Sequence, residues 1–179
     1  MGKLTSVRLR KVNEMRKIND KIILGLVVGV LANIPKTILC TSFNKSGITK
    51  RKCSDLAASM FIPARKVFTT KGEIFGFLCD FVIAAFDGIF LVHLLLFTGK
   101  VTKGKAIIKG LLSGLFIFGI FRGIFAKVGT GKVYPKDMLT NMVMGTNSSI
   151  WGIIAGLLVL MLGHEDLFQS KSSCPTSQQ

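Results

Sequence analysis

A continuous apolar stretch, residues 74–97, constrains this chain more than any other feature. Its 24 residues, IFGFLCDFVIAAFDGIFLVHLLLF, are enough for a helix that crosses the apolar core of a bilayer. The stretch also contains Asp80 and Asp87. A carboxylate inside a membrane span is costly and needs a partner. We therefore expect a membrane protein in which other segments supply partners for these acids.

The composition of the whole chain indicates the same class of protein. Of the 179 residues, 49% are hydrophobic, and the mean hydropathy of +0.52 is high for a soluble domain. The formal net charge is +15, but most of the Lys and Arg residues flank apolar stretches. There they fix topology and contact anionic lipid headgroups. We therefore expect a multi-pass protein of a cell membrane, with the lipid bilayer and its anionic headgroups as partners and no nucleic acid.

Four stretches are long enough to cross a membrane: residues 22–43, 74–97, 106–126 and 138–162. The predicted fold is all-α, a four-helix transmembrane bundle over residues 22–162 with a short interfacial helix between spans 1 and 2. That helix is expected to start at Ser54 and Asp55 and to stop before Pro63. Residues 1–21 carry seven basic residues and form either an amphipathic surface helix or a solvated tail. Residues 163–179 are expected to be disordered.

The first span has two interpretations. Pro35 removes a backbone donor and kinks a helix, whereas a turn at residues 33–35 would make the segment a re-entrant hairpin. A crossing helix distributes the basic residues of the tails and loops almost evenly, 11 against 10, between the two sides. A hairpin gives 17 against 4, which fits the positive-inside rule better. We still predict four crossings with both termini inside, because the segment is long enough to span.

Several polar residues fall at similar depths in the predicted spans, counted at about 1.5 Å per residue. This polar cluster consists of Lys36, Asp80, Asp87, Arg122, Asn141 and Asn147. One interpretation is a charge-neutralised group of Lys36, Asp80 and Arg122 that fixes helix register. The other is an ion or proton path lined by Asp80, Asp87 and the two amides.

Small residues spaced four apart occur in three of the spans. The pairs are Gly25 and Gly29, Gly110 and Gly114, Gly119 and Gly123, and Gly152 and Gly156. Such pairs let two helix backbones approach closely. We expect them to serve packing inside the bundle, and a homo- or hetero-oligomer is the alternative.

The sequence has no catalytic or metal-binding motif. There is no HExxH, GxSxG or P-loop pattern, and the four cysteines, Cys40, Cys53, Cys79 and Cys174, form no CxxC or Cys/His cluster. We therefore predict no enzymatic activity, no metal and no cofactor. The predicted function is a non-enzymatic packing or complex-forming component of the membrane. The alternative is a proton- or cation-conducting transporter or channel component that uses Asp80 and Asp87.

Four segments resemble those of a known group of proteins: LGLVVGVLANIPK, SDLAASMF, HLLLFTGK and GLLSGLFIFGIF. In these segments the chain resembles the small four-helix membrane proteins of unknown function from spore-forming Gram-positive bacteria. The resemblance covers about residues 20–165. It implies a four-helix architecture and a bacterial inner membrane, and it implies no activity, because none is established for that group.

Overall fold

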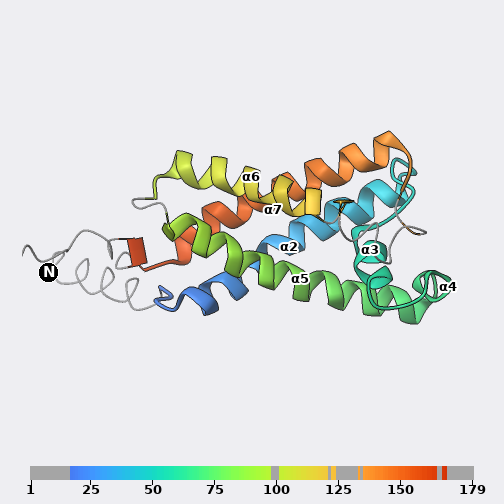
Figure 1. Ribbon diagram of the computed structural model, residues 1–179, viewed down its shortest axis with the longest axis horizontal. Helices are drawn as coiled ribbons and strands as arrows, with labels where there is room; N and C mark the ends of the chain where they lie inside the picture. The colour runs from blue at the N-terminus through green and yellow to red at the C-terminus, as the bar shows by residue number, and fades with distance from the viewer. Residues whose placement is uncertain are drawn as a thin grey trace, which may run out of the picture.

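The computed structural model describes residues 17–97, 101–120, 122–123, 133, 135–164 and 167–168 (Figure 1). The helices in this part of the chain are α2 (Lys21–Lys45), α3 (Cys53–Ser59), α4 (Ala64–Val67), α5 (Thr70–Phe97), α6 (Lys103–Ile120) and α7 (Met138–Leu162). No strand occurs among these residues, which confirms the all-α class. Most of the two predicted tails, residues 1–16 and 169–179, lies outside the described residues.

Three of these helices, α2, α5 and α7, are long and apolar enough to cross a membrane. Their bounds extend or match the predicted spans 1, 2 and 4. The predicted third span corresponds to α6, which has 18 residues and carries Lys103, Lys105 and Lys109. These three lysines set α6 apart from the three long apolar helices, so a fourth crossing stays a prediction.

Aspartates fix the start of two of the long helices. The carboxylate of Asp20 accepts hydrogen bonds from the backbone N–H groups of Ile22 and Ile23, at 2.7 and 2.9 Å. The carboxylate of Asp137 accepts one from the N–H of Thr140 at 2.9 Å. Each cap satisfies donors that the first turn of a helix leaves without an intrahelical partner.

Helix α2 continues through Pro35, so the re-entrant hairpin is not formed. At one end, the N–H of Ile18 donates to the carbonyl of Leu162 at 2.8 Å. At the other end, the N–H of Lys50 donates to the hydroxyl of Thr140 at 3.1 Å. Helix α2 therefore runs antiparallel to α7 along the whole length of that helix.

The short helix α3 begins at Cys53, one residue before the predicted start. The carboxylate of Asp55 accepts the backbone N–H of Lys52 at 3.0 Å, which closes its first turn. Leu56, Ala57 and Ala58 are buried, and α3 packs mainly on α5, as Figure 1 shows. Its position at a membrane interface stays a prediction.

Glycines bring α2 and α5 into backbone contact. A Cβ atom on Gly25 would lie 2.4 Å from the Cα of Ile89, and one on Gly29 would lie 2.1 Å from the carbonyl oxygen of Ala84. A Cβ on Gly88 would lie 2.2 Å from the carbonyl oxygen of Gly25. No larger residue fits at these three positions without moving a backbone.

The same device joins α6 to α7. A Cβ on Gly110 would lie 2.1 Å from the carbonyl oxygen of Gly152, and one on Gly152 would lie 2.0 Å from that of Gly110. Cβ atoms on Gly114 and Gly156 would also fall within 2.4 Å of backbone oxygens on the other helix. The predicted internal packing is thus confirmed for these pairs, and the bundle is built from two tight helix pairs.

The fourth predicted pair, Gly119 and Gly123, does not pack inside the bundle. A Cβ on either glycine would meet no atom within 4 Å in the described structure. The reason is the helical period, because nine residues separate Gly110 from Gly119, or about 2.5 turns. Gly119 therefore points away from the side of α6 that packs on α7, and Gly123 lies three residues beyond the end of α6.

The two helix pairs meet chiefly through α2 and α7. Leu24 and Val28 of α2 are fully buried in one apolar core with Trp151, Ala155 and other residues of α5, α6 and α7. Helix α5 touches α6 and α7 much less extensively. That thin contact leaves a cavity between the pairs, which contains the candidate site.

Candidate functional site

Lys36 of α2 and Asp80 of α5 form a buried ion pair at the centre of the site. The ammonium Nζ of Lys36 lies 2.7 Å from Oδ1 of Asp80, and the two side chains are 13% and 9% exposed. The position is about nine residues from the end of α2 and ten from the start of α5. The depth count therefore predicted this pair correctly.

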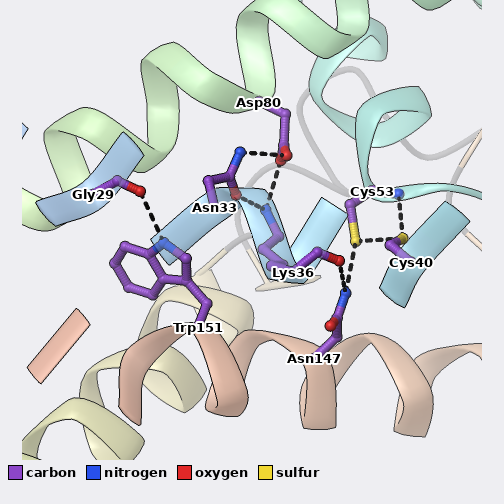
Figure 2. A network of polar contacts seen from close by, with 8 residues as sticks. All are labelled: Gly29, Asn33, Lys36, Cys40, Cys53, Asp80, Asn147 and Trp151. Carbon is purple, nitrogen blue, oxygen red and sulfur yellow. Dashed lines mark hydrogen bonds and ion pairs between the residues drawn. The ribbon is translucent and has the colours of Figure 1, made fainter. Parts of the chain in front are cut away.

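Asn33 closes the ion pair into a three-membered network (Figure 2). Its Nδ2 donates to Oδ2 of Asp80 at 3.0 Å, and its Oδ1 accepts from Nζ of Lys36 at 2.9 Å. Asn33 precedes Lys36 by three residues, so both side chains leave the same face of α2. Both carboxylate oxygens of Asp80 are therefore hydrogen-bonded, which offsets the cost of burying the charge.

Helix α7 adds two hydrogen bonds to carbonyl groups of α2, as Figure 2 shows. Nδ2 of Asn147 donates to the carbonyl of Lys36 at 3.0 Å, and Nε1 of Trp151 donates to that of Gly29 at 3.3 Å. The predicted Asn147 therefore does reach the network, but through the backbone of Lys36. These bonds position α7 on the pair formed by α2 and α5.

Asp87 lies two helical turns after Asp80 and lines a cavity of about 70 Å³. The cavity is bounded by Lys36, Asp80, Ser148 and mostly apolar residues of α3, α5, α6 and α7. No hydrogen bond or ion pair of the Asp87 side chain occurs in the described part of the chain. Asp87 thus shares the cavity with the Lys36–Asp80 pair without joining its network.

Arg122 and Asn141 lie outside this cavity. Together they line a separate, open hollow on α6 and α7. Nδ2 of Asn141 donates to the carbonyls of Pro135 and Asp137, at 3.0 and 2.8 Å, at the start of α7. The prediction that Arg122 completes a triad with Asp80 is wrong, because α6 packs on α7 and Asn33 occupies the second oxygen of Asp80. Counting residues from the end of a span gives the depth of a side chain in the membrane, but it does not show which helix lies beside it.

Two residues of the site were missed by sequence reasoning. Asn33 could have been found, because its spacing of three from Lys36 places two polar side chains on one face of an apolar helix. Trp151 is an indole in the last span, where a buried N–H needs an acceptor. Its acceptor is the backbone carbonyl of Gly29, and every residue has such a carbonyl, so the sequence could not identify this one.

A cysteine pair adjoins the network. Sγ of Cys40, on α2, lies 2.9 Å from Sγ of Cys53, the first residue of α3, and accepts the backbone N–H of Cys53 at 3.0 Å. Nδ2 of Asn147 lies 4.0 Å from Sγ of Cys53. The hydrogen bond with Cys40, together with burial, raises the pKa of the Cys53 thiol. Sequence reasoning found no sign of this contact, because 13 residues separate the two cysteines. The chain reverses direction at Gly47, which has a φ of 74°, and this reversal brings Cys53 back to Cys40.

Comparisons with known proteins give no match: no family model, no curated protein and no solved structure is significantly similar to the chain. The geometry of the chain itself therefore supports the proposals that follow.

Proposed function

We propose that this protein is a non-enzymatic component of a membrane that assembles with a second copy of itself or with another membrane protein, through the outer face of α6. The proposal rests on the distribution of polar and apolar side chains and on one pair of glycines. The resemblance to small bacterial membrane proteins is compatible with it and adds no activity.

The side-chain distribution supports placement in a bilayer. Phe86 of α5, Ile38 of α2 and Ile108 of α6 are 65%, 61% and 58% exposed, whereas Asn33 and Asn147 are 0% and 2% exposed. In water, such an apolar surface would be unfavourable and prone to aggregate. In a bilayer the same surface would contact lipid, while Asn33 and Nδ2 of Asn147 keep hydrogen-bond partners inside the bundle.

The single observation that carries assembly is the outward-facing pair, Gly119 and Gly123. Helix α6 already uses Gly110 and Gly114 against α7, and Gly119 lies about half a turn away from Gly110 around the helix. Gly123 follows three residues after the end of α6, and a Cβ on it also meets no described atom within 4 Å. Small residues spaced by four are typical of close helix–helix contacts in membranes. None of the described helices docks on Gly119 and Gly123, and we assign that contact to another chain.

The test is cross-linking and native electrophoresis of the full chain, first in its membrane and then in a mild detergent. We expect a specific complex that is lost in the double variant Gly119→Leu, Gly123→Leu. Gly104→Leu is the matched control, since a Cβ at Gly104 also meets no atom within 4 Å. A wild-type protein that is strictly monomeric and without partners, or a complex indifferent to the double substitution, contradicts the proposal.

Asp87 supports a second candidate function, proton or cation transfer. Its side chain lines the same cavity as Lys36, Asp80 and Ser148, and no partner for it occurs in the described residues. A carboxyl group in a small cavity that also contains an ion pair and a hydroxyl group can bind and release a proton or hold a cation. An intramembrane acid of this kind is a typical member of a transport path.

Flux measurements in liposomes test this second candidate. Purified wild-type protein should carry protons or cations, and Asp87→Asn should abolish the flux while preserving the fold. Leu78→Val, at an exposed apolar position on the same helix, is the control that should retain the flux. An absence of flux in the wild-type protein, or unchanged flux in Asp87→Asn, would remove the candidate.

A further inference from the structure

The cysteine pair lies where α2 ends and α3 begins. Thirteen residues separate Cys40 from Cys53 in sequence, yet their sulfur atoms are 2.9 Å apart. That separation is shorter than a van der Waals contact between two sulfur atoms and about 0.9 Å longer than a disulfide bond. A small movement of either side chain brings the sulfurs to bonding distance.

The two thiols have different surroundings. Cys40 is 5% exposed, and its sulfur accepts the backbone N–H of Cys53 at 3.0 Å. Cys53 is partly exposed and lines the cavity beside Asp80 and Lys36. A reagent that enters the cavity therefore meets Cys53 first, and Cys40 lies behind it.

We propose that Cys40 and Cys53 are a thiol–disulfide exchange site whose substrate is a small aliphatic disulfide, R–S–S–R. The thiolate of Cys53 attacks one substrate sulfur, forms a mixed disulfide, and releases R–S⁻. Sγ of Cys40 then attacks Sγ of Cys53, forms the Cys40–Cys53 bond, and releases the second R–S⁻. The two protons of the protein thiols end on the two released thiols, so two cysteines are oxidised and one disulfide is reduced.

The new bond would join α2 to α3 at the wall of the cavity. Asn147 lies between this bond and the polar network, since its Nδ2 contacts both Sγ of Cys53 and the carbonyl of Lys36. Oxidation therefore fixes α3 over the Lys36–Asp80 pair. Because the site is independent of the outer face of α6, its test is also independent of the proposed assembly.

The rate of the first step should depend on pH in a defined direction. The hydrogen bond with Cys40 and burial raise the pKa of the Cys53 thiol, so the reactive thiolate is scarce at neutral pH. Oxidation should accelerate as the pH rises toward that pKa. Exposed thiols of ordinary pKa approach their maximal rate at lower pH.

The experiment uses the full chain in detergent, reduced, then incubated with bis(2-hydroxyethyl) disulfide, a small aliphatic disulfide, and quenched with a maleimide. Peptide mapping by mass spectrometry should show Cys40 linked to Cys53, with the mass of two hydrogen atoms lost and Cys79 labelled by the maleimide. Cys79→Ser is the matched control and should leave the linked peptide unchanged.

Two variants separate the steps. Cys40→Ser should accumulate a stable mixed disulfide between Cys53 and 2-mercaptoethanol, the thiol half of the probe, because the resolving thiol is absent. Cys53→Ser should give no mixed disulfide at Cys40. If Cys40→Ser fails to fold, the wild-type linkage and its acceleration with pH carry the test. Wild-type protein in which Cys40 and Cys53 both remain labelled, or in which either pairs with Cys79 instead, overturns the proposal.

Discussion

At the scale of single residues, Asp80 is a charge held inside an apolar helix by complete hydrogen bonding. One oxygen lies 2.7 Å from the ammonium of Lys36, and the other accepts from Asn33 at 3.0 Å. A buried ion pair need not stabilise a fold relative to an apolar pair of similar shape. Removing only one partner is different, because it leaves a buried charge without compensation.

Asp80→Ala should therefore destabilise the protein strongly, by about 3–5 kcal/mol. The substitution leaves the ammonium of Lys36 buried without its counter-ion. Adding Lys36→Met should recover part of that loss, since it removes the stranded charge. The measurement is thermal unfolding in detergent of the wild-type protein, both single variants and the double variant. A neutral Asp80→Ala would show that the pair has no structural role.

Arg122→Met provides the control for this cycle. Arg122 lines a different hollow, so its replacement should not rescue Asp80→Ala. Rescue by Arg122→Met would mean that the charge of Asp80 is balanced from α6. The sequence was compatible with Lys36 or Arg122 as the partner of Asp80. Counting residues gives the depth of each side chain along its helix, but it does not give the order of the helices around the bundle. The sequence narrowed the charged partner of Asp80 to Lys36 and Arg122. The spacing of Asn33 from Lys36 was the available signal for the third member of the network.

Asp137 carries a prediction of pH dependence outside the spans. Its side-chain hydrogen bond with Thr140 lowers the pKa of the carboxyl group below its usual value. A lowered pKa means that the ionised form is preferred in the folded state, so the stabilisation is present above the unfolded pKa of about 3.9. It is lost as the pH falls through the lower pKa of the folded protein.

Asp137→Ala should lower the melting temperature at pH 7, and the difference from wild type should shrink as the pH falls below the unfolded pKa of about 3.9. Thermal unfolding across that pH range is the measurement. Lys136→Ala, at the adjacent exposed residue, should show no such convergence. A difference that persists unchanged in acid would mean that the carboxylate of Asp137 does not act as the cap of α7.

At the scale of helices, backbone contact through glycine organises the bundle. The spacing of four residues revealed the faces on α2, α6 and α7, but it did not reveal which face meets which helix. Gly119 and Gly123 have the same spacing as Gly110 and Gly114, but Gly119 lies on the opposite side of α6 and Gly123 lies beyond its end. The glycine spacing did not reveal the packing face of α5, because the two small residues spaced by four on that face are Ala84 and Gly88 and only one of them is a glycine.

Gly88→Val tests the contact between α2 and α5. The new side chain would begin 2.2 Å from the carbonyl oxygen of Gly25, so the helices must separate or shift. We expect a loss of about 1–3 kcal/mol or more, the usual cost of overpacking. Gly104→Val is the control, because nothing lies within 4 Å of that position. Equal stability of both variants in thermal unfolding would contradict a tight contact between α2 and α5.

At the scale of the whole molecule, the order of the helices follows from two pairings. Helices α2 and α5 are antiparallel, because Gly25 faces Ile89 and Lys36 faces Asp80. Helices α6 and α7 are antiparallel through Gly110 and Gly152. Hydrophobic length predicted the three long helices correctly. It could not predict the pairing, because every span is apolar enough to pack against any other.

The two ends of the bundle are formed by different segments of the chain. Ile18 is hydrogen-bonded to the residues that follow α7, at the end where α2 begins. The chain reversal at Gly47, together with α3, α4 and the cysteine pair, lies at the opposite end (Figure 1). Basic residues are almost equally numerous in the segments at the two ends, so charge alone left the path of the first span open. The hydrogen bonds at both ends of α2 resolve the path within the fold.

The path of α2 predicts which positions share a side of the membrane. Asn19 and Thr102 are exposed at the end where α2 begins, and Ser46 is exposed where α2 ends. Cysteines are introduced one at a time at these three positions and labelled with an impermeant maleimide. Asn19→Cys and Thr102→Cys should be labelled from one side of the membrane, and Ser46→Cys should be labelled from the other side. The reason is that 25 helical residues separate Asn19 from Ser46, at about 1.5 Å each, which exceeds the apolar thickness of a bilayer. Labelling before and after permeabilisation gives the side, and the wild-type protein gives the background from its native thiols. Should Asn19→Cys and Ser46→Cys be labelled from the same side, α2 does not cross the membrane, and the apolar surface of the bundle must be covered by something other than lipid.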